Sequence, residues 1–354
     1  MKIIAFGINH KTAPIEIREK FYLTPIQQDL FLSELKNDPT IAESLVLSTC
    51  NRTEVYLHTM MSGPYTEPLV KLISQIKKID VSRDASKYFY LYEEEQALRH
   101  FLRVTAGLDS LVLGEKQILG QVKKAVERAR EKAMLGRYFN ILSNMAIRSA
   151  KKAHNETNIS FGGSSISWAA INMAEDLMGT LEGKSILIIG AGKMGELALG
   201  QVRKKGVKRI YLLNRTEANA VTLAQKCGGI VVPFCDIKET LSEVDICICS
   251  AGAPHYILEK STVEKVMRLR NDRKLILLDI SMPRNIDPQV ATLNNVFLTC
   301  IDDLDRVVGE NMLKRQSAAV DVEKIIESKL TEFRARLSKL KKESIDRYTE
   351  SVEA

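Results

Sequence analysis

The sequence predicts an α/β protein of several domains: an α+β amino-terminal domain, a doubly wound domain with a parallel sheet, and a long C-terminal helix. Three observations lead to this prediction. The 354 residues suffice for about two domains, at roughly 150 residues each. Short apolar runs recur at the spacing of alternating strands and helices. The stretch after Gly309 contains neither glycine nor proline.

The first domain is expected to span residues 1–157, where strand patterns alternate with helical ones. Strands are expected at 3–8, 45–48, 55–58 and 88–92. Residues 93–156 have a mostly helical pattern. The composition then changes to SFGGSSIS around residue 160, and such a glycine- and serine-rich segment marks a hinge.

The second domain, residues 158–302, contains six nearly continuous apolar runs at the spacing of β-α-β units. They cover 185–189, 209–214, 229–232, 246–250, 275–280 and 295–298. Strands that are apolar along their whole length are buried on both faces. This pattern indicates a parallel, doubly wound sheet.

The remaining region, 303–354, has the pattern of one long amphipathic helix. Its apolar seam alternates spacings of four and three, at Ile326, Leu330, Phe333, Leu337 and Leu340. Such a seam needs a covering surface. Either the chain's own domains or the same helix of a second subunit supplies it.

The composition is that of a folded globular protein, with 45% hydrophobic and 27% charged residues. The net charge of +7 is concentrated in residues 116–158, which hold ten Lys or Arg and three acidic residues. A basic helical stretch of this kind attracts polyanions, so nucleic acid is a candidate partner. The alternative is a solvated helix face.

No apolar run is longer than a strand, so we expect no membrane segment and a cytoplasmic protein. Six cysteines are few for this length, and we expect them to be free thiols in a reducing compartment. Cys247 and Cys249 share one face of an expected strand, but no CxxC pair or histidine cluster accompanies them. We therefore predict no metal site.

A glycine pattern indicates a dinucleotide site, because SILIIGAGKMG places GxGxxG directly after an expected strand and before an expected helix. The first glycine permits a tight turn, the second lets the backbone approach a pyrophosphate, and the third allows close helix packing. The candidate cofactor contacts are Gly190, Ala191, Gly192, Lys193, Met194 and Gly195.

The next expected strand ends in LLNRT, where an NAD-preferring site presents an acidic residue to the ribose. Here Asn214, Arg215 and Thr216 occupy the corresponding positions. Arg215 can bind a 2′-phosphate by charge-assisted hydrogen bonds, so the sequence predicts NADPH. The alternative is an arginine that is paired on the surface.

Cys50 is the candidate nucleophile, because it stands at a strand exit where the pattern turns polar, in STCNRT. A thiol beside a cation, here Arg52, can be exposed and partly ionised. A purely structural cysteine is the alternative. His10, His58 and His100 share this domain, and sequence spacing does not decide which lies near Cys50.

Together these segments resemble the glutamyl-tRNA reductase family. The resemblance extends from residue 1 to about 320. It rests on GINHKTAPIEIRE (7–19), LSTCNRTEVY (47–56), GLDSLVLGEKQILGQVKKA (107–125), GAGKMG (190–195), LLNRT (212–216), ISMPRNIDP (280–288) and IDDLD (301–305).

The resemblance implies NADPH-dependent reduction of glutamyl-tRNA to glutamate-1-semialdehyde, the first step of five-carbon tetrapyrrole biosynthesis. Cys50 would form a thioester, and His100 would be important for activity. The glutamyl pocket would be lined by Thr49, Cys50, Asn51, Arg52, Ser110, Glu115, Lys116, Gln117 and Gln121. Arg52 could clamp a substrate carboxylate, and its alternative is a salt bridge with Glu54.

The resemblance also implies glutamate-1-semialdehyde aminomutase as the receiver of the product, and a dimerisation region beyond the long helix that this sequence lacks. We therefore expect at most a weak homodimer, held by the helix seam. Two alternatives stay open: an oxidoreductase of shikimate-dehydrogenase type, and an inactive tRNA-binding paralogue. The first leaves Cys50 unexplained, and the intact Cys50, Arg52, His100 and glycine turn argue against the second.

Overall fold

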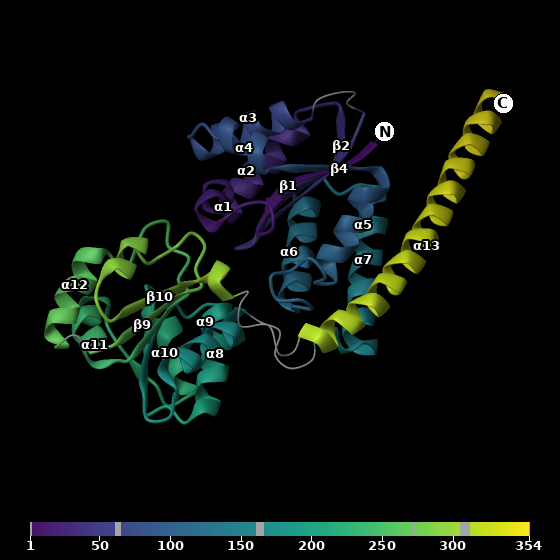
Figure 1. Cartoon of the computed structure of the whole chain (residues 1–354). Coiled ribbons are helices and arrows are strands. Elements are labelled where there is room, and N and C mark those ends of the chain that lie inside the picture. The colour runs from purple at the N-terminus through teal and green to yellow at the C-terminus, as the bar shows by residue number, and fades with distance from the viewer. Residues whose placement is uncertain (1, 61–64, 161–165, 272, 305–311, 354) are drawn as a thin grey trace. The chain divides into compact units, whose positions relative to one another are not determined.

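The computed structural model describes residues 2–60, 65–160, 166–271, 273–304 and 312–353 (Figure 1). In the last helix, side chains are described for 317–336 and 338. The chain forms two compact units. Unit 1 comprises residues 1–13, 23–162 and 311–354, and unit 2 comprises 14–22 and 163–310. The two units therefore interleave in sequence: a short early segment belongs to unit 2, and the C-terminal helix belongs to unit 1.

Unit 1 is built on a four-stranded antiparallel sheet with the order β2-β3-β1-β4. Its strands are β1 (Lys2–Asn9), β2 (Ile41–Ser48), β3 (Arg52–Thr59) and β4 (Tyr90–Glu93). Ser48 pairs with Thr53, and Asn9 pairs with Arg52. The β2–β3 turn and the carboxyl end of β1 consequently lie at the same end of the sheet.

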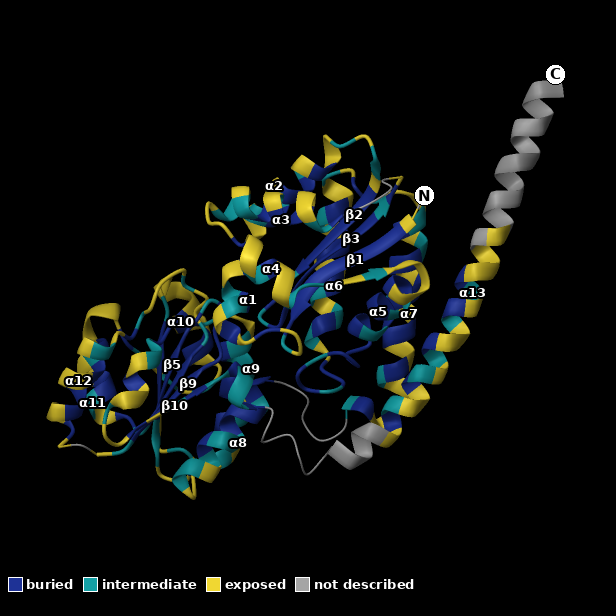
Figure 2. Ribbon diagram, turned by 45° about the horizontal axis from the view of Figure 1, so that its top comes forward, coloured by how far each residue is buried: buried dark blue, intermediate teal, exposed yellow. Residues whose placement is uncertain are grey.

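Helices cover both faces of this sheet. They are α2 (Pro25–Lys36), α3 (Thr66–Lys77), α4 (Ser82–Tyr88), α5 (Glu94–Thr105), α6 (Gln117–Glu131), α7 (Arg137–Glu156), the 3₁₀ turn η1 (Asn158–Ser160) and α13 (Met312–Glu353). Helices α2 and α3 lie on the opposite side of the sheet from α5 and α7 (Figures 1 and 2). A capping box formed by Thr24 and Gln27 starts α2, with Pro25 at its first position.

The seam of α13 packs inside its own chain. Ile326, Leu330 and Phe333 are at most 1% exposed and belong to the same core as α5, α6 and α7. Figure 2 shows buried residues along the part of α13 that passes α7. Ion pairs also join α13 to α5: Arg99–Glu327, Arg103–Glu323 and Arg334–Glu95.

Of the two covers expected for this seam, the chain's own helices are the one found at three of its five positions, so these three cannot hold the expected weak homodimer. Ile326, Leu330 and Phe333 are covered by the chain's own helices, which removes their apolar surface from water without a partner. The side chains of Leu337 and Leu340 lie outside the described residues.

Unit 2 contains a six-stranded parallel sheet with the order β10-β9-β8-β5-β6-β7. The strands are β5 (Ser185–Ile189), β6 (Arg209–Leu213), β7 (Ile230–Val231), β8 (Ile246–Cys249), β9 (Leu275–Asp279) and β10 (Val296–Cys300). Each predicted run overlaps one of them, and the order is that of the doubly wound nucleotide-binding fold. Ligands of such folds bind where the order reverses, here between the carboxyl ends of β5 and β8.

Helices flank this sheet, with α11 and α12 on one side and α8 and α9 on the other (Figure 1). The helices of unit 2 are α1 (Ile15–Phe21), α8 (Ile166–Met178), α9 (Lys193–Val202), α10 (Glu217–Gln225), α11 (Ile237–Glu243) and α12 (Lys260–Leu269). The 3₁₀ turns are η2 (Arg203–Lys205), η3 (Phe234–Asp236) and η4 (Pro288–Thr292). Among the described residues, no helix combines the length and the apolarity that crossing a membrane requires.

Candidate active site

Cys50 lies at the tip of the turn between β2 and β3, where it is half-buried. The turn is closed by a hydrogen bond from the Thr49 amide to the Arg52 carbonyl, 2.8 Å long. The Asn51 amide donates to the Thr49 hydroxyl at 3.2 Å. Thr49 and Asn51 are both buried, so the turn holds the thiol in a fixed position between two buried neighbours.

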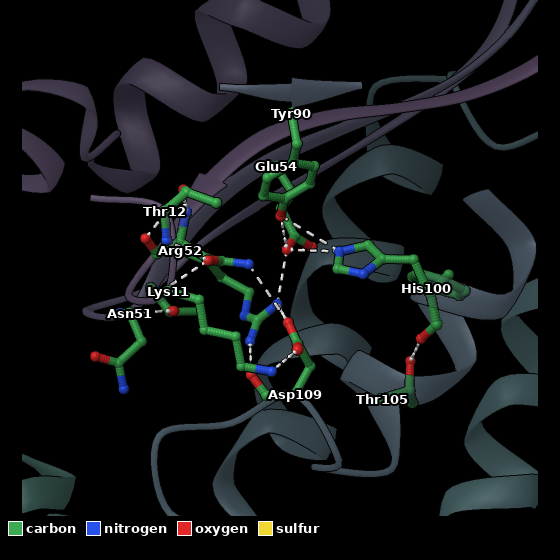
Figure 3. A network of polar contacts seen from close by, with 12 residues as sticks. Lys11, Thr12, Asn51, Arg52, Glu54, Tyr90, His100, Thr105 and Asp109 are labelled. Carbon is green, nitrogen blue, oxygen red and sulfur yellow. Dashed lines mark hydrogen bonds and ion pairs between the residues drawn. The ribbon is translucent and has the colours of Figure 1, made fainter. Parts of the chain in front are cut away.

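Arg52 is almost completely buried, with 1% of its side chain exposed. One guanidinium nitrogen donates to Glu54 at 2.7 Å and to Asp109 at 3.1 Å (Figure 3). The other donates to the backbone carbonyl of Asp109. The observed partners of Arg52 thus include the salt bridge with Glu54, which was the alternative to a substrate clamp.

Glu54 is the centre of this cluster and has no exposed surface. Besides Arg52, its carboxylate accepts hydrogen bonds from the hydroxyls of Tyr56 and Tyr90, both at 2.5 Å, and it lies 3.0 Å from Nε2 of His100 (Figure 3). Burial alone would raise the pKa of Glu54, but the charges of Arg52 and His100 hold this pKa well below its ordinary value. Glu54 is therefore an anion that only accepts hydrogen bonds.

His100 belongs to α5 and is 8% exposed. Because the ionised Glu54 is an acceptor, Nε2 of His100 carries the hydrogen of their contact. The ring lies among those of Tyr56, Tyr90 and Tyr92, with centroid distances of 6.4, 5.3 and 5.0 Å. His100 thus joins the cluster around Arg52 through Glu54.

The other two histidines have different partners in unit 1. His58 contacts Glu43 at 3.3 Å and stacks on Tyr138 at 4.5 Å, in a separate group of side chains. His10 is connected to the turn through its backbone, since its amide donates to the Asn51 carbonyl at 3.0 Å.

Asp109 links the cluster to the end of β1. Its carboxylate accepts from Arg52, from the ammonium group of Lys11 and, at 3.4 Å, from the side-chain amide of Asn9 (Figure 3). Burial would raise the pKa of Asp109, but Arg52 and Lys11 outweigh it and lower this pKa. Asp109 and Glu54 together surround the guanidinium of Arg52 with two negative charges.

Glu115 follows Asp109 in the segment that leads from α5 to α6, and it is 6% exposed. Burial raises its pKa to about 7, although Arg52 partly opposes the shift. A carboxyl group with this pKa exchanges a proton near neutral pH.

The remaining predicted substrate residues lie in the same segment or at the start of α6. Ser110 is half-buried, Lys116 is the exposed residue before the helix, and Gln117 and Gln121 are half-buried one turn apart. The side-chain nitrogen of Gln117 is buried without a hydrogen-bond partner among the described residues.

Sequence reasoning missed the supporting residues Tyr90 and Asp109, and it named Glu54 only as an alternative partner of Arg52. For Glu54 a signal existed, because positions two apart on a strand share one face, and Arg52 is two residues earlier. Gly7 pairs with Glu54 across the sheet, and a Cβ at Gly7 would lie 2.7 Å from the Glu54 Cγ. The absence of a side chain at Gly7 leaves room for the buried carboxylate.

In unit 2, the predicted glycine turn joins β5 to α9. Gly190 has a φ of +105°, and a Cβ there would lie 2.8 Å from the Ala251 nitrogen. A Cβ at Gly195 would lie 2.0 Å from the Gly190 oxygen. Among the described residues, nothing lies within 4 Å of a Cβ position at Gly192, directly before α9. The turn therefore leaves open space at the helix N-terminus, which fits the pyrophosphate of a dinucleotide.

Asn214, at the end of β6, holds this turn. Its side-chain oxygen accepts from the Ala191 amide at 3.0 Å, and its side-chain nitrogen donates to the Thr216 carbonyl at 2.8 Å. Arg215 and Thr216 are exposed. Asn214 thus holds the turn, and Arg215 is an exposed cation at this edge.

The other predicted cofactor contacts lie on the first turn of α9. Lys193 is exposed and pairs with Glu196 at 3.2 Å, while the Met194 carbonyl accepts from the Ser167 hydroxyl at 3.1 Å. Among the described residues there is no group of three or more His, Cys, Asp or Glu that could hold a metal ion. None of the six cysteines, all in described segments, forms a disulfide.

Comparison with known proteins identifies both units. Residues 6–157 match the family "Glutamyl-tRNAGlu reductase, N-terminal domain", and residues 172–307 match "Shikimate / quinate 5-dehydrogenase". The glutamyl-tRNA reductase of Priestia megaterium is 40% identical over 345 residues, which cover 96% of this chain and 76% of that protein. The one from Geobacillus kaustophilus is 41% identical over 338 residues, covering 94% and 73%.

A solved structure points to the same family as these relatives. The glutamyl-tRNA reductase from Methanopyrus kandleri is 33% identical, with a TM-score of 0.54, and the match covers 97% of this chain and 82% of that one. The shikimate-dehydrogenase likeness is confined to the second unit, whereas the reductase likeness includes the segment with Cys50. Because identity of this degree extends over almost its whole length, the chain belongs to the glutamyl-tRNA reductase family.

Proposed function

We propose that this protein reduces the glutamyl group of glutamyl-tRNA to glutamate-1-semialdehyde with NADPH, the first step of tetrapyrrole synthesis. The observation that carries this proposal is the half-buried Cys50 at a hydrogen-bonded turn, within a chain that belongs to the reductase family. The doubly wound unit implies a nicotinamide cofactor, which supplies a hydride when bound.

In the proposed mechanism, the Cys50 thiolate attacks the carbonyl carbon of the ester that joins glutamate to the tRNA. The carbon–oxygen bond breaks, tRNA leaves with its ribose hydroxyl, and a thioester remains. Hydride addition to the thioester carbon and loss of the Cys50 sulfur then yield the aldehyde and regenerate the thiolate. No metal ion is needed for either step.

Arg52, Glu54, Asp109 and His100 keep the surroundings of the turn in one arrangement. Arg52 lies directly after the turn, and its two anionic partners fix its position. Glu54 in turn orients the His100 ring. We propose that Thr49, Asn51, Ser110, Glu115, Lys116, Gln117 and Gln121 contact the glutamyl group or the tRNA end, as in the family.

The test of the activity uses purified protein, glutamyl-tRNA and NADPH, with detection of glutamate-1-semialdehyde. Formation of the aldehyde supports the proposal. Oxidation of shikimate with NADP⁺, or tRNA binding without aldehyde formation, would instead support one of the two alternatives. The intact Cys50, Arg52 and glycine turn disfavour an inactive paralogue.

We expect the enzyme to prefer NADPH over NADH, because Arg215 is exposed where the 2′-phosphate would lie and no acidic residue follows β6 directly. Loss of one charge-assisted contact costs about 1.5–3 kcal/mol, which is roughly ten- to a hundredfold. Arg215→Ala should reduce the NADPH-to-NADH ratio of kcat/KM by this factor. Equal use of both cofactors by the unchanged protein would contradict the prediction.

We expect the basic stretch 116–158 to contribute to tRNA binding through exposed lysines. Lys123 and Lys124 are exposed on α6, whereas Arg128 binds Asp29 at 2.9 Å and Gln28 at 2.8 Å. Replacing both lysines by alanine should raise KM for glutamyl-tRNA and flatten its dependence on salt by about one unit per lost phosphate contact. An unchanged KM and slope would assign the charge to a solvated surface.

Arg128 provides the matched comparison for this test. Because the guanidinium of Arg128 already binds residues of α2, Arg128→Ala should lower stability more than it lowers tRNA affinity.

We also propose that an aminomutase receives the aldehyde. We further propose that the protein forms at most a weak homodimer and is located in the cytoplasm.

A further inference from the structure

Helix α1 belongs to unit 2, although the segments before and after it belong to unit 1. Two segments from the far end of the sequence hold it there. One is the loop after β9 and the other follows β10. In a doubly wound fold, the carboxyl ends of the strands form the edge that receives the nucleotide. Helix α1 is thus attached to segments that begin at the cofactor edge.

Arg284, in the loop after β9, makes the first attachment. Its guanidinium binds both carboxylate oxygens of Glu19, at 2.8 and 3.2 Å, and Glu16 at 2.9 Å. The side chain of Arg284 is 10% exposed, and a bidentate pair with this little solvent has a defined geometry. The loop itself is fixed by Asp279, whose carboxylate accepts from the amides of Ser281, Asn285 and Ile286.

Asp302, two residues after β10, makes the second attachment. Its carboxylate accepts from the Ile15 amide at 2.9 Å and from both terminal nitrogens of Arg18, at 2.7 and 3.1 Å. Pro14, the residue before α1, provides no side-chain cap. Asp302 therefore caps the helix from another segment and places a negative charge at its positive end.

The chain on either side of α1 contacts the turn that carries Cys50. Before the helix, the His10 amide donates to the Asn51 carbonyl at 3.0 Å. After the helix, the Leu23 amide donates to the Ser48 hydroxyl at 2.9 Å. Only four residues separate His10 from Ile15, and one separates Phe21 from Leu23. Because a chain spans at most about 3.6 Å per residue, these short connections limit how far α1 can move without displacing the residues that contact the turn.

We propose that α1 couples nucleotide binding in unit 2 to the conformation of the Cys50 turn, with Arg284 and Asp302 as positioning residues. The inference rests on the proposed function, since it takes Cys50 as the reacting thiol and NADPH as the ligand of the glycine turn. Coupling between two sites is reciprocal, so a change at Cys50 also alters NADPH affinity.

The test measures the rate at which iodoacetamide alkylates Cys50, with and without saturating NADPH and without tRNA. Mass spectrometry separates the Cys50 peptide from that of Cys235, which is exposed and serves as the internal reference. We expect NADPH to change the Cys50 rate by at least about fivefold, the lower end of typical coupling. The Cys235 rate should not change.

In Arg284→Ala, the NADPH effect on Cys50 should fall below about twofold while NADPH still binds with nearly unchanged affinity, measured by nicotinamide fluorescence. Combining Arg284→Glu with Glu19→Arg restores opposite charges at the same positions and should recover the effect. Arg268→Ala is the matched control, because it removes an exposed pair with Glu264 in the same unit. It should leave the effect intact.

An NADPH effect that persists in Arg284→Ala, or its absence from the unchanged protein, overturns the proposal. Circular dichroism checks folding. If Arg284→Ala does not fold, the NADPH effect on Cys50 alkylation is measured in the exchanged pair and in Arg284→Lys instead. If the protein produces aldehyde but NADPH does not change the rate of Cys50 alkylation, the coupling alone is disproved. A protein that produces no aldehyde disproves the proposed function.

Discussion

Replacing Cys50 by serine is expected to lower the rate of aldehyde formation at least about a thousandfold while the protein stays folded. The hydroxyl has a much higher pKa than the thiol, and so almost none of it is ionised at neutral pH. The side chain is half-buried at a turn closed by backbone hydrogen bonds, so the substitution changes little packing. Acid quenching and gel analysis with labelled glutamate should detect no thioester in the variant.

Cys247→Ser is the matched control for this prediction. Cys247 is fully buried in β8, where burial raises the pKa of its thiol. A hydroxyl placed there without a partner costs about 1–3 kcal/mol of stability. This variant should melt earlier but retain its activity per folded molecule. Substantial aldehyde formation by Cys50→Ser would remove Cys50 from the role of nucleophile.

The strands and the glycine turn of unit 2 could be predicted because their signals are local. A buried parallel strand is a continuous apolar run, and 185–189 was predicted with the bounds that β5 has. The GxGxxG spacing directly follows that strand, and Gly190 and Gly195 have the constrained positions that the pattern demands.

The partners of Arg52 could be predicted only in part, because one is local and one is distant. Glu54 is two residues away on the same strand face, but Asp109 is 57 residues away, beyond any periodic signal. For the same reason no sequence pattern predicts the attachment of helix α1, since Arg284 lies 265 residues from Glu19. Ion pairs between distant segments depend on tertiary structure.

The seam of α13 illustrates a different limit. Spacings of four and three identify an apolar face but not what covers it. Ile326 and Phe333 could have packed on a second helix or on the chain's own core, and both arrangements have the same sequence pattern. The structure resolves the choice through the neighbouring helices α5 and α7, whose own apolar faces needed the same cover.

The acid response of the protein should depend strongly on Glu54 and Asp109. Both carboxyl groups have pKa values below their unfolded values of 4.5 and 3.8, because Arg52 outweighs the effect of burial. A group whose pKa is lowered in the folded state contributes stability that is fully present above its unfolded pKa and is lost as the pH falls through its folded pKa. Glu115 and Asp279 act in the opposite direction, since burial raises their pKa values to about 7 and about 6.

Glu54→Gln is therefore expected to lower the free energy of unfolding by about 3–5 kcal/mol at pH 7, because it leaves Arg52 buried with one fewer negative partner. Its free energy of unfolding should also fall less steeply than that of the unchanged protein between about pH 4.5 and pH 2, since the variant lacks the carboxyl group that is protonated in the unfolded state and still ionised in the folded state over this range. Urea unfolding at several pH values measures both effects. Glu115 and Asp279 are present in both proteins and cancel in the comparison.

Activity separates a positioning role of Glu54 from a merely structural one. Because Glu54 orients both Arg52 and His100, its substitution should reduce kcat by roughly a hundredfold even in the folded fraction, as small displacements of reacting groups do. Glu43→Gln is the matched control: Glu43 is also buried, and it binds the amides of Tyr138 and Phe139 at the start of α7. That variant should lose comparable stability while kcat per folded molecule stays unchanged. An equal loss of kcat in both variants would mean that Glu54 supports the fold and not the reaction.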